Sequence, residues 1–429
     1  MRSSLVRRAL QTVVVGGVVA GALLSTALPA HADLPSGTFA VTAGGSDTTE
    51  NIMNEYLTGK TTSNDGTTTH TVQTYNIPAI PTANYPVDND GRCDAVAGAP
   101  GYTGGTINWN FNGAQSPPKA PSGSGAGRTV LLAQRNVNGN VRACMDIARS
   151  SSKGSEAGLE YFAFAMDAVS WSTPSLKAPA RLTRAQVKDI YTCNVTDWSQ
   201  VGGVPGAIQR YLPQSTSGTY SVFNTEWLDG TAASLPTTPS CPAVKIIDKN
   251  GNPFEENQGN TLLDADIDKA ILPYSSGVWV FQKNNSVNPS LDKRNNVRLG
   301  GLETVTGPVV ANTARWNASN GVYELDYVNA SNPNGVVSDQ NTTLINGAFS
   351  KVNGFTGVRF LFNVVDTQNL QSYGPAVGLV GFDNAAAPTF RSPMCNNLAR
   401  TTILSYGFAP LTSTGGGTFN QAASTCRKF

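Results

Sequence analysis

Histidine is nearly absent from this chain of 429 residues, which contains only His31 and His70. His31 lies in the N-terminal leader described below, so His70, in a Thr-rich stretch, is the one imidazole of the remaining chain. A Ser-His-Asp triad or a multi-histidine metal site would depend on that single residue. The cysteines include no CxxC pair, which argues against a thiolate zinc site. We therefore expect no metal, no cofactor and no enzymatic activity.

Neither sign of charge dominates, because 30 Lys and Arg face 29 Asp and Glu. Residues 1–32 hold three Arg and no acidic residue, so the chain without them has 27 basic and 29 acidic residues and a net charge of −2. Such a surface does not attract nucleic acid. We expect no nucleic-acid partner.

Long hydrophobic runs are also lacking, and the longest lies near the N-terminus. Arg2, Arg7 and Arg8 precede an apolar run at 13–24, and Ala-His-Ala at 30–32 has the small residues of a cleavage site. The run is short for a membrane anchor. Residues 1–32 are therefore predicted to be a signal peptide, and the protein to be secreted, either extracellular or at the cell surface.

All six cysteines follow the leader. An even number in an oxidising compartment predicts three disulfides, although six cysteines allow 15 connectivities. We favour pairing in sequence order: Cys93 with Cys144, Cys193 with Cys241, and Cys395 with Cys426.

Strand-like segments at 38–42, 161–170 and 358–365 alternate with helix-like segments such as 182–191 and 397–405. This alternation predicts an α/β fold with mainly parallel strand pairing. About 400 residues remain after the leader, which suggests two domains.

Three short features are interpreted from local composition alone. The apolar run 278–281 favours a strand, and the Gly-Ser stretch 123–127 favours a turn. Glu255 and Glu256 lie between segments rich in Gly, Asn and Pro, which predicts a solvated turn rather than a hydrolytic pair of carboxylates.

Three loops of small residues, at 45–49, 149–152 and 214–219, stand out for their chemistry. The first and the third lead directly into helix-like stretches. Hydroxyl groups and the free amides of a helix N-terminus can bind an oxyanion, to which Arg149 would add a positive charge. The alternative for each loop is that its Ser or Thr only caps a helix.

The order of several segments resembles the phosphate-binding proteins of ABC importers, which have the type II periplasmic-binding-protein fold. The resemblance extends over roughly residues 38–411. The segments are GSDTT (45–49), DIARSSS (146–152), LTRAQVKDIYTCNVTDWSQVGG (182–203), TSGTYSVF (216–223), AILPYSSGVW (270–279), RFLFNVV (359–365) and GFAPL (407–411).

The resemblance implies two lobes joined by two crossover strands, with the ligand in the cleft between them. Lobe one would comprise residues 33–168 and 363–429, and lobe two residues 169–362. Each disulfide in sequence order would then stay within one lobe and leave the hinge free.

The resemblance also implies a ligand-binding set, and the sequence departs from it twice. Pro213 stands where the family usually has an Arg, and Ser151 where it has an Asp that accepts a proton of phosphate. We expect Arg149 and Asp47 to replace these two functions. The expected ligand-binding residues are Ser46, Asp47, Thr48, Arg149, Ser150, Ser151, Gln214, Ser217, Gly218 and Thr219.

The function that follows is that of a monomeric, secreted solute-binding protein, which captures an oxyanion, foremost inorganic phosphate, and delivers it to an ABC permease. One alternative is a secreted phosphatase-like enzyme using Ser46 or Thr48. Another is a cell-surface interaction protein that keeps the fold without the ligand, for which the departures at Pro213 and Ser151 are the evidence.

Overall fold

A computed structural model describes most of the chain that follows the expected signal peptide. The described residues are 39–57, 59–64, 69–77, 79, 85–86, 102–103, 106–107, 121–133, 145–303, 313–327, 329, 331–333, 335–337, 344–345, 348–349, 357–368, 373–381, 392–395, 397–411, 418–419 and 426–429. All belong to one compact unit, Leu34–Phe429. The expected signal peptide and the expected Cys93–Cys144 disulfide lie outside them. Within the described chain, no helix has the length and apolar character to cross a membrane.

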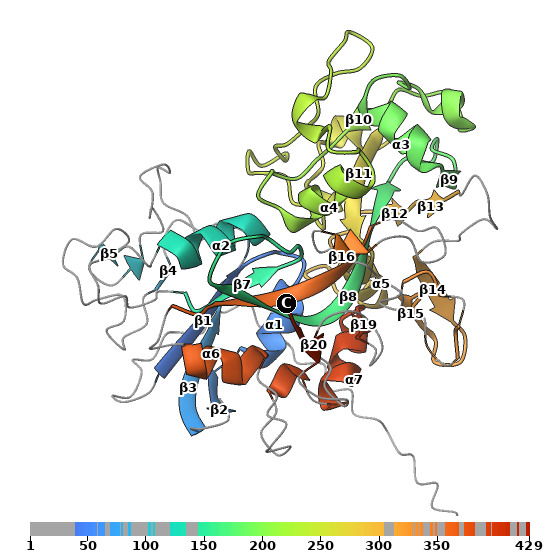
Figure 1. The fold of residues 1–429 in the computed structure, drawn as a ribbon. Coiled ribbons are helices and arrows are strands. Elements are labelled where there is room, and N and C mark those ends of the chain that lie inside the picture. The colour runs from blue at the N-terminus through green and yellow to red at the C-terminus, as the bar shows by residue number, and fades with distance from the viewer. Residues whose placement is uncertain are drawn as a thin grey trace, which may run out of the picture. The chain divides into compact units, whose positions relative to one another are not determined.

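Eight strands follow one another across the main sheet in the order β10-β11-β8-β18-β7-β1-β3-β2 (Figure 1). Their bounds are β1 Phe39–Gly45, β2 Gly59–Asn64, β3 Thr69–Asn76, β7 Ile147–Ser150, β8 Leu159–Thr173, β10 Gln209–Arg210, β11 Ala270–Ser275 and β18 Val358–Asp366.

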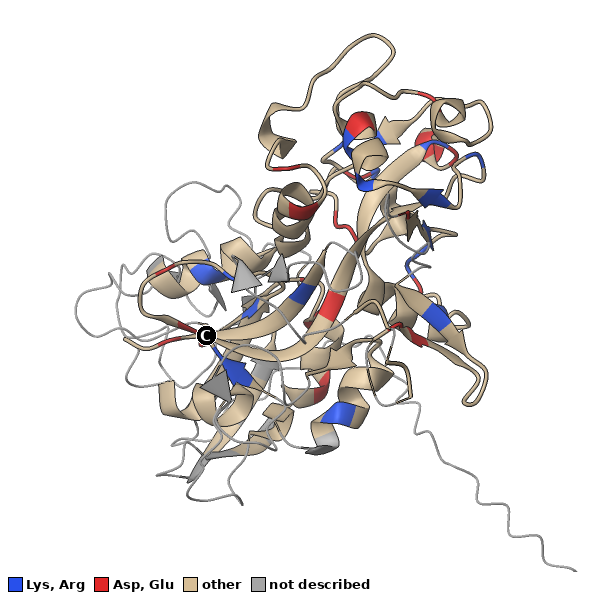
Figure 2. Ribbon diagram, turned by 45° about the vertical axis from the view of Figure 1, so that its right-hand side comes forward, with Lys and Arg blue, Asp and Glu red and all other residues tan. Residues whose placement is uncertain are grey.

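The sheet is mixed, which corrects the expectation of mainly parallel pairing. Strand β1 runs parallel to β3 and β7, whereas β18 runs antiparallel to both β7 and β8. Most of the antiparallel pairs involve the two long strands β8 and β18 in the middle of the sheet, and β2 and β3 form a further antiparallel pair at its edge. The two long strands are buried on both faces. Few charged positions interrupt them (Figure 2).

Strand β8 connects two groups of strands. Its first part, up to Ala168, pairs with β18, and its last part, from Val169 to Ser172, pairs with β11. A single strand of 15 residues therefore carries the loops at both ends of the sheet on one continuous hydrogen-bonded support. The lobe boundaries expected from the sequence remain a prediction.

In the part of the chain that the structure describes, seven α-helices flank these strands: α1 Glu50–Tyr56, α2 Ser124–Ala133, α3 Arg184–Tyr191, α4 Gly218–Glu226, α5 Ser276–Asn284, α6 Tyr373–Val380 and α7 Asn397–Ser405. The helices expected at 182–191 and 397–405 are confirmed as α3 and α7. Helix α3 begins at a capping box, in which Thr183 accepts from the amide of Gln186 and the Gln186 side chain accepts from the amide of Thr183.

Two local expectations were wrong. The run 278–281 belongs to helix α5, because Ser275 caps its N-terminus by accepting from the amide of Val278. A short apolar run has the same composition in a buried strand and in a buried helix. The stretch 123–127 does not form a free turn, because helix α2 already begins at Ser124.

The shorter strands pair with β8 or β18, with one another, or in small separate sheets. They are β4 Tyr85–Pro86, β5 Tyr102–Thr103, β6 Thr106–Ile107, β9 Arg181–Leu182, β12 Arg298–Leu299, β13 Gly301–Leu302, β14 Ala314–Asn317, β15 Val322–Leu325, β16 Leu344–Ile345, β17 Ala348–Phe349, β19 Ala409–Pro410, β20 Thr418–Phe419 and β21 Arg427–Lys428.

Hydrophobic packing and disulfides fix both ends of the sheet. One large core contains Trp171, Trp198 and Trp227, all fully buried, and another packs helices α1 and α7 against β1 and β18. The Cys193–Cys241 and Cys395–Cys426 disulfides are formed, which confirms two of the three expected pairs.

Candidate functional site

The first loop connects β1 to α1 and is held from behind by β7. The amide of Ser46 donates to the carbonyl oxygen of Arg149 at 3.0 Å. Gly45 has a φ of +119°, and a Cβ there would lie 2.7 Å from the same carbonyl oxygen, so only glycine fits. The backbone thereby presents Ser46 and Thr48, whose side chains are buried.

The third loop ends at Ser217, which is the N-cap of helix α4. The Ser217 hydroxyl oxygen accepts from the amides of Thr219 and Tyr220 at 3.0 and 3.2 Å, and the hydroxyl donates to Glu256 Oε2 at 3.2 Å. The capping alternative raised by the sequence therefore holds for Ser217. Thr219, two residues further along the chain, is left to interact with other groups.

The second loop contributes Ser151 and not Ser150 to the surface facing the first loop. Ser151 Oγ accepts from Ser46 Oγ at 3.1 Å and lies 3.3 Å from Ser124 Oγ. The Ser150 hydroxyl donates to the carbonyl of Ser152 and accepts from Arg128. Its hydrogen bonds are thus formed with its own loop and with helix α2, not with the first loop.

Arg149, the expected cation of the site, contacts the backbone of the first loop. Its Nε donates to the carbonyl of Ser46 at 3.0 Å and its Nη1 to the carbonyl of Ile77 at 2.7 Å, with a further bond to Asn76. The side chain is fully buried. In this structure Arg149 braces the first loop, and its role toward a ligand stays a prediction.

A second buried arginine, Arg359 on β18, connects the first and third loops. Its Nη1 donates to Thr219 Oγ1 at 2.7 Å and its Nη2 to Thr48 Oγ1 at 3.3 Å. Its Nε and Nη2 also donate to Asp167 Oδ2 on β8, at 3.0 and 2.8 Å. Both charged side chains are fully buried. Arg359 was not among the residues expected from the sequence.

Asp167 holds the Arg359 guanidinium in this orientation. Besides the arginine, its carboxylate accepts from the Ser275 hydroxyl at 2.7 Å and from the amide of Gly277 at 2.8 Å. A buried ion pair is favourable only when further hydrogen bonds satisfy its oxygens, and here they do. The guanidinium is therefore fixed before any ligand arrives.

Three carboxyl groups lie beside these loops: Asp47, Glu255 and Glu256. One oxygen of each lies within 4.8 Å of the others. Glu255 and Glu256 are 6% and 0% exposed, so the expected solvated turn was wrong. Neighbours distant in sequence bury them, since Ser122 donates to Glu255 at 2.6 Å and Ser217 donates to Glu256.

Burial and, to a smaller extent, the negative charge of Glu256 raise the pKa of Asp47, whereas the Asn257 amide and Arg359 lower it. The net result is a pKa of about 7. Burial and the charges of Asp47 and Glu256 likewise hold the pKa of Glu255 well above its ordinary value of 4.5. Desolvation favours the neutral form of a carboxyl group, and neighbouring carboxylates add to this effect.

We expect the protein to lose stability as the pH rises from about 4 to about 7. The buffer for this measurement contains a chelator and no phosphate. Below the ordinary pKa of 3.8, Asp47 is protonated in both the folded and the unfolded protein. Above this pKa, the unfolded chain releases its proton, whereas the folded chain retains it until about pH 7. Since Asp47 is only partly buried, the loss should be on the order of 2 kcal/mol. Urea unfolding at pH 4.5, 6.0 and 7.5 measures it. Asp47→Asn should make the profile shallower, with the raised pKa of Glu255 accounting for the slope that remains, and identical profiles would contradict the assignment.

Further bonds join loops that the sequence places in different lobes. The amide of Gly125 donates to the carbonyl of Thr216 at 2.9 Å, Asn257 donates to Asp47 at 2.9 Å, and Gln214 donates to Ser122 Oγ at 2.8 Å. All three expected loops thus meet at one place, with Arg359 among them.

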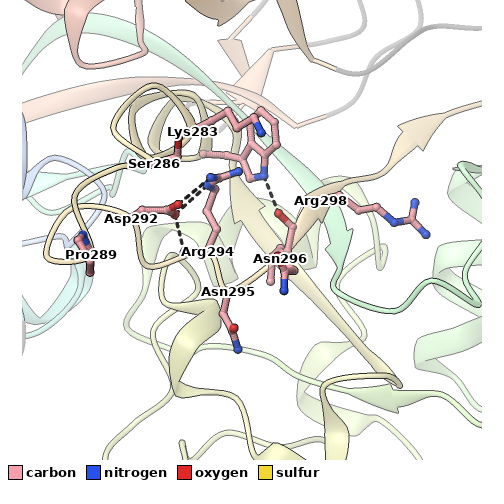
Figure 3. A pocket seen from close by; sticks show the side chains of 10 residues that line it. Lys283, Ser286, Pro289, Asp292, Arg294, Asn295, Asn296 and Arg298 are labelled. Atoms are coloured by element: carbon pink, nitrogen blue, oxygen red, sulfur yellow. Dashed lines mark hydrogen bonds and ion pairs between the residues drawn. The ribbon is translucent and has the colours of Figure 1, made fainter.

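A separate pocket of about 450 Å³ is lined by none of these residues (Figure 3). Arg294 lies over the Trp279 ring, 5.3 Å from its centroid, and is paired with Asp292 at 2.7 Å. The loops around Arg359 remain the better candidate for a binding site.

Comparison with known proteins agrees with this geometry. Residues 102–290 match the family model of the periplasmic-binding-protein (PBP) superfamily domain. The expected resemblance and the type II periplasmic-binding-protein fold are thereby confirmed. The match covers less than half of the chain and includes neither Arg359 nor the first loop, so the position of a ligand stays a prediction. No protein with a curated description matches the chain.

Several solved structures are similar to this chain. A Clostridium perfringens phosphate ABC transporter substrate-binding protein with bound phosphate is 14% identical, with 86% of this chain and 98% of that chain covered and a TM-score of 0.41. A human phosphate-binding apolipoprotein is 17% identical, with 86% of this chain and 91% of that chain covered and a TM-score of 0.43. A Vibrio cholerae ABC-type phosphate transport receptor is 16% identical, with 67% of this chain and 86% of that chain covered and a TM-score of 0.35.

Proposed function

We propose that this protein is a secreted solute-binding protein that captures an oxyanion, inorganic phosphate, and delivers it for ABC-type uptake. The observation that carries the proposal is the position of Arg359. Its guanidinium donates to Thr48 in the first loop and to Thr219 at the start of helix α4. A fixed cation between two loops of neutral donors is the arrangement that an oxyanion requires.

The same loops favour phosphate over sulfate. Hydroxyl groups of Ser46, Thr48 and Thr219 would donate to the oxygens of either anion. Hydrogen phosphate carries a proton near neutral pH, which it can donate in a hydrogen bond to Asp47 once that carboxyl group is ionised, above its raised pKa of about 7. Sulfate has no such proton and would be repelled by the carboxylate. Asp47 would therefore supply the charged acceptor that a serine at position 151 does not.

The position of Arg359 also bears on the alternative of a protein that has lost its ligand. That alternative relied on Pro213 standing in place of an arginine. Arg359 supplies a buried cation from β18 instead, so the missing positive charge no longer argues against binding.

In the two-lobe division, the contacts between Gly125 and Thr216 and between Asn257 and Asp47 are the closing contacts.

Isothermal titration with phosphate and sulfate tests this function. We expect phosphate to release or absorb heat and sulfate to bind far more weakly. Thr219→Val, which removes the hydroxyl beside Arg359, should weaken phosphate binding about tenfold. Thr225→Val changes an exposed hydroxyl of the same helix and should leave affinity unchanged. No phosphate heat under any condition that keeps the protein folded would refute the proposal.

A further inference from the structure

The carboxyl groups of Asp47, Glu255 and Glu256 have no cation of their own. Within the described parts of the chain, no Lys or Arg forms an ion pair with any of the three, and Arg359 is already paired with Asp167. Three carboxyl groups this close cannot all be ionised in a buried place without a positive charge between them.

One oxygen in this group has no donor from outside the three carboxyl groups. Glu256 Oε2 accepts from Ser217, but Glu256 Oε1 is buried and has no hydrogen-bond partner. The Glu256 side chain is fully buried, so solvent does not satisfy that oxygen. A buried carboxylate oxygen without a donor carries a cost of the order of 1–3 kcal/mol, which a ligand can remove.

We propose that Asp47, Glu255 and Glu256 bind a hard divalent cation of the Ca²⁺ class. Such ions prefer carboxylate oxygens at 2.3–2.6 Å, so ligand oxygens around one ion lie up to about 5 Å apart. The three carboxyl groups provide oxygens within 4.8 Å of one another. Glu256 Oε1 is the oxygen that the ion would satisfy.

The absence of a metal was expected because the sequence offers no set of imidazole or thiolate ligands. This site uses oxygen ligands only, from the loop after β1 and from the loop that precedes β11. Its ligands come together because Asn257, next to Glu256, donates to Asp47. One consequence rests on the proposed function. The cation would neutralise the carboxylates beside the bound anion, so that each ligand strengthens binding of the other.

The test uses the full secreted chain, treated with EDTA and exchanged into phosphate-free buffer at pH 7.5. Calcium chloride should raise the unfolding temperature by about 4 °C or more, and calorimetric titration should give one site. Glu256→Gln should weaken calcium binding at least about tenfold, because ligand charge sets affinity. Asp264→Asn, at an exposed acid whose side chain is 83% accessible, is the matched control.

Asp47→Asn provides a second variant if Glu256→Gln does not fold, and it should weaken calcium binding equally. Equal calcium responses of the wild type and the folded variant would overturn the proposal. The proposal would also be overturned if acid stabilised the wild type and neither calcium nor magnesium did, because protons would then neutralise the three carboxyl groups. The measurement contains no phosphate, so its failure leaves the anion site untouched, and failure of phosphate binding leaves the calcium result standing.

Discussion

Arg359→Met should abolish measurable phosphate binding and destabilise the protein. The substitution removes the buried cation that contacts Thr48 and Thr219, and a charge-assisted contact of this kind accounts for at least about a hundredfold in affinity. It also leaves Asp167 fully buried with only Ser275 and Gly277 as donors. An uncompensated buried charge costs about 3–5 kcal/mol.

A double variant separates these two effects. Arg359→Met with Asp167→Asn removes both charges, so urea unfolding should show that most of the lost stability returns. Calorimetry should still show no phosphate binding, since the cation remains absent. Recovery of phosphate affinity in the double variant would mean that Arg359 only supports the fold.

A capped helix and two disulfides were predicted correctly from the sequence. The capped helix at 182–191 formed because Thr183 and Gln186 satisfy each other three residues apart, and the cysteine pairs 193–241 and 395–426 were found by order alone. The helix over 276–284 was missed because its apolar run is too short to show a period. Its start depends on the cap at Ser275.

The site was predicted in part, and the missing part is non-local. Arg359 stands in the segment RFLFNVV, where a single charge in an apolar strand was a signal available in the sequence. Its importance depends on Asp167, which only the register of β18 against β8 places opposite it. The acidic pair at 255–256 was misjudged for the same reason, because the groups that bury it, Ser122 and Ser217, lie in other loops.

The position of Gly218 leads to the second large effect. Helix α4 begins at Gly218, where a Cβ would lie 2.4 Å from Ser151 Oγ, 2.5 Å from Ser124 Oγ and 2.9 Å from the carbonyl carbon of Ser151. The two hydroxyls could rotate away, but the backbone carbon could not. An alanine at this position would therefore push the third loop away from the second.

Gly218→Ala should accordingly weaken phosphate binding at least about a hundredfold while leaving the free energy of unfolding nearly unchanged. Binding needs Thr219 and the first loop around one anion, and in the two-lobe division the added methyl group holds the lobes apart. Folding does not need that contact, and alanine is a better helix former than glycine by about 1 kcal/mol. Calorimetry and urea unfolding measure the two quantities, with Ser221→Ala, at an exposed position of the same helix, as the control. Wild-type affinity in Gly218→Ala would show that the close approach of these loops is not required for capture of the ligand.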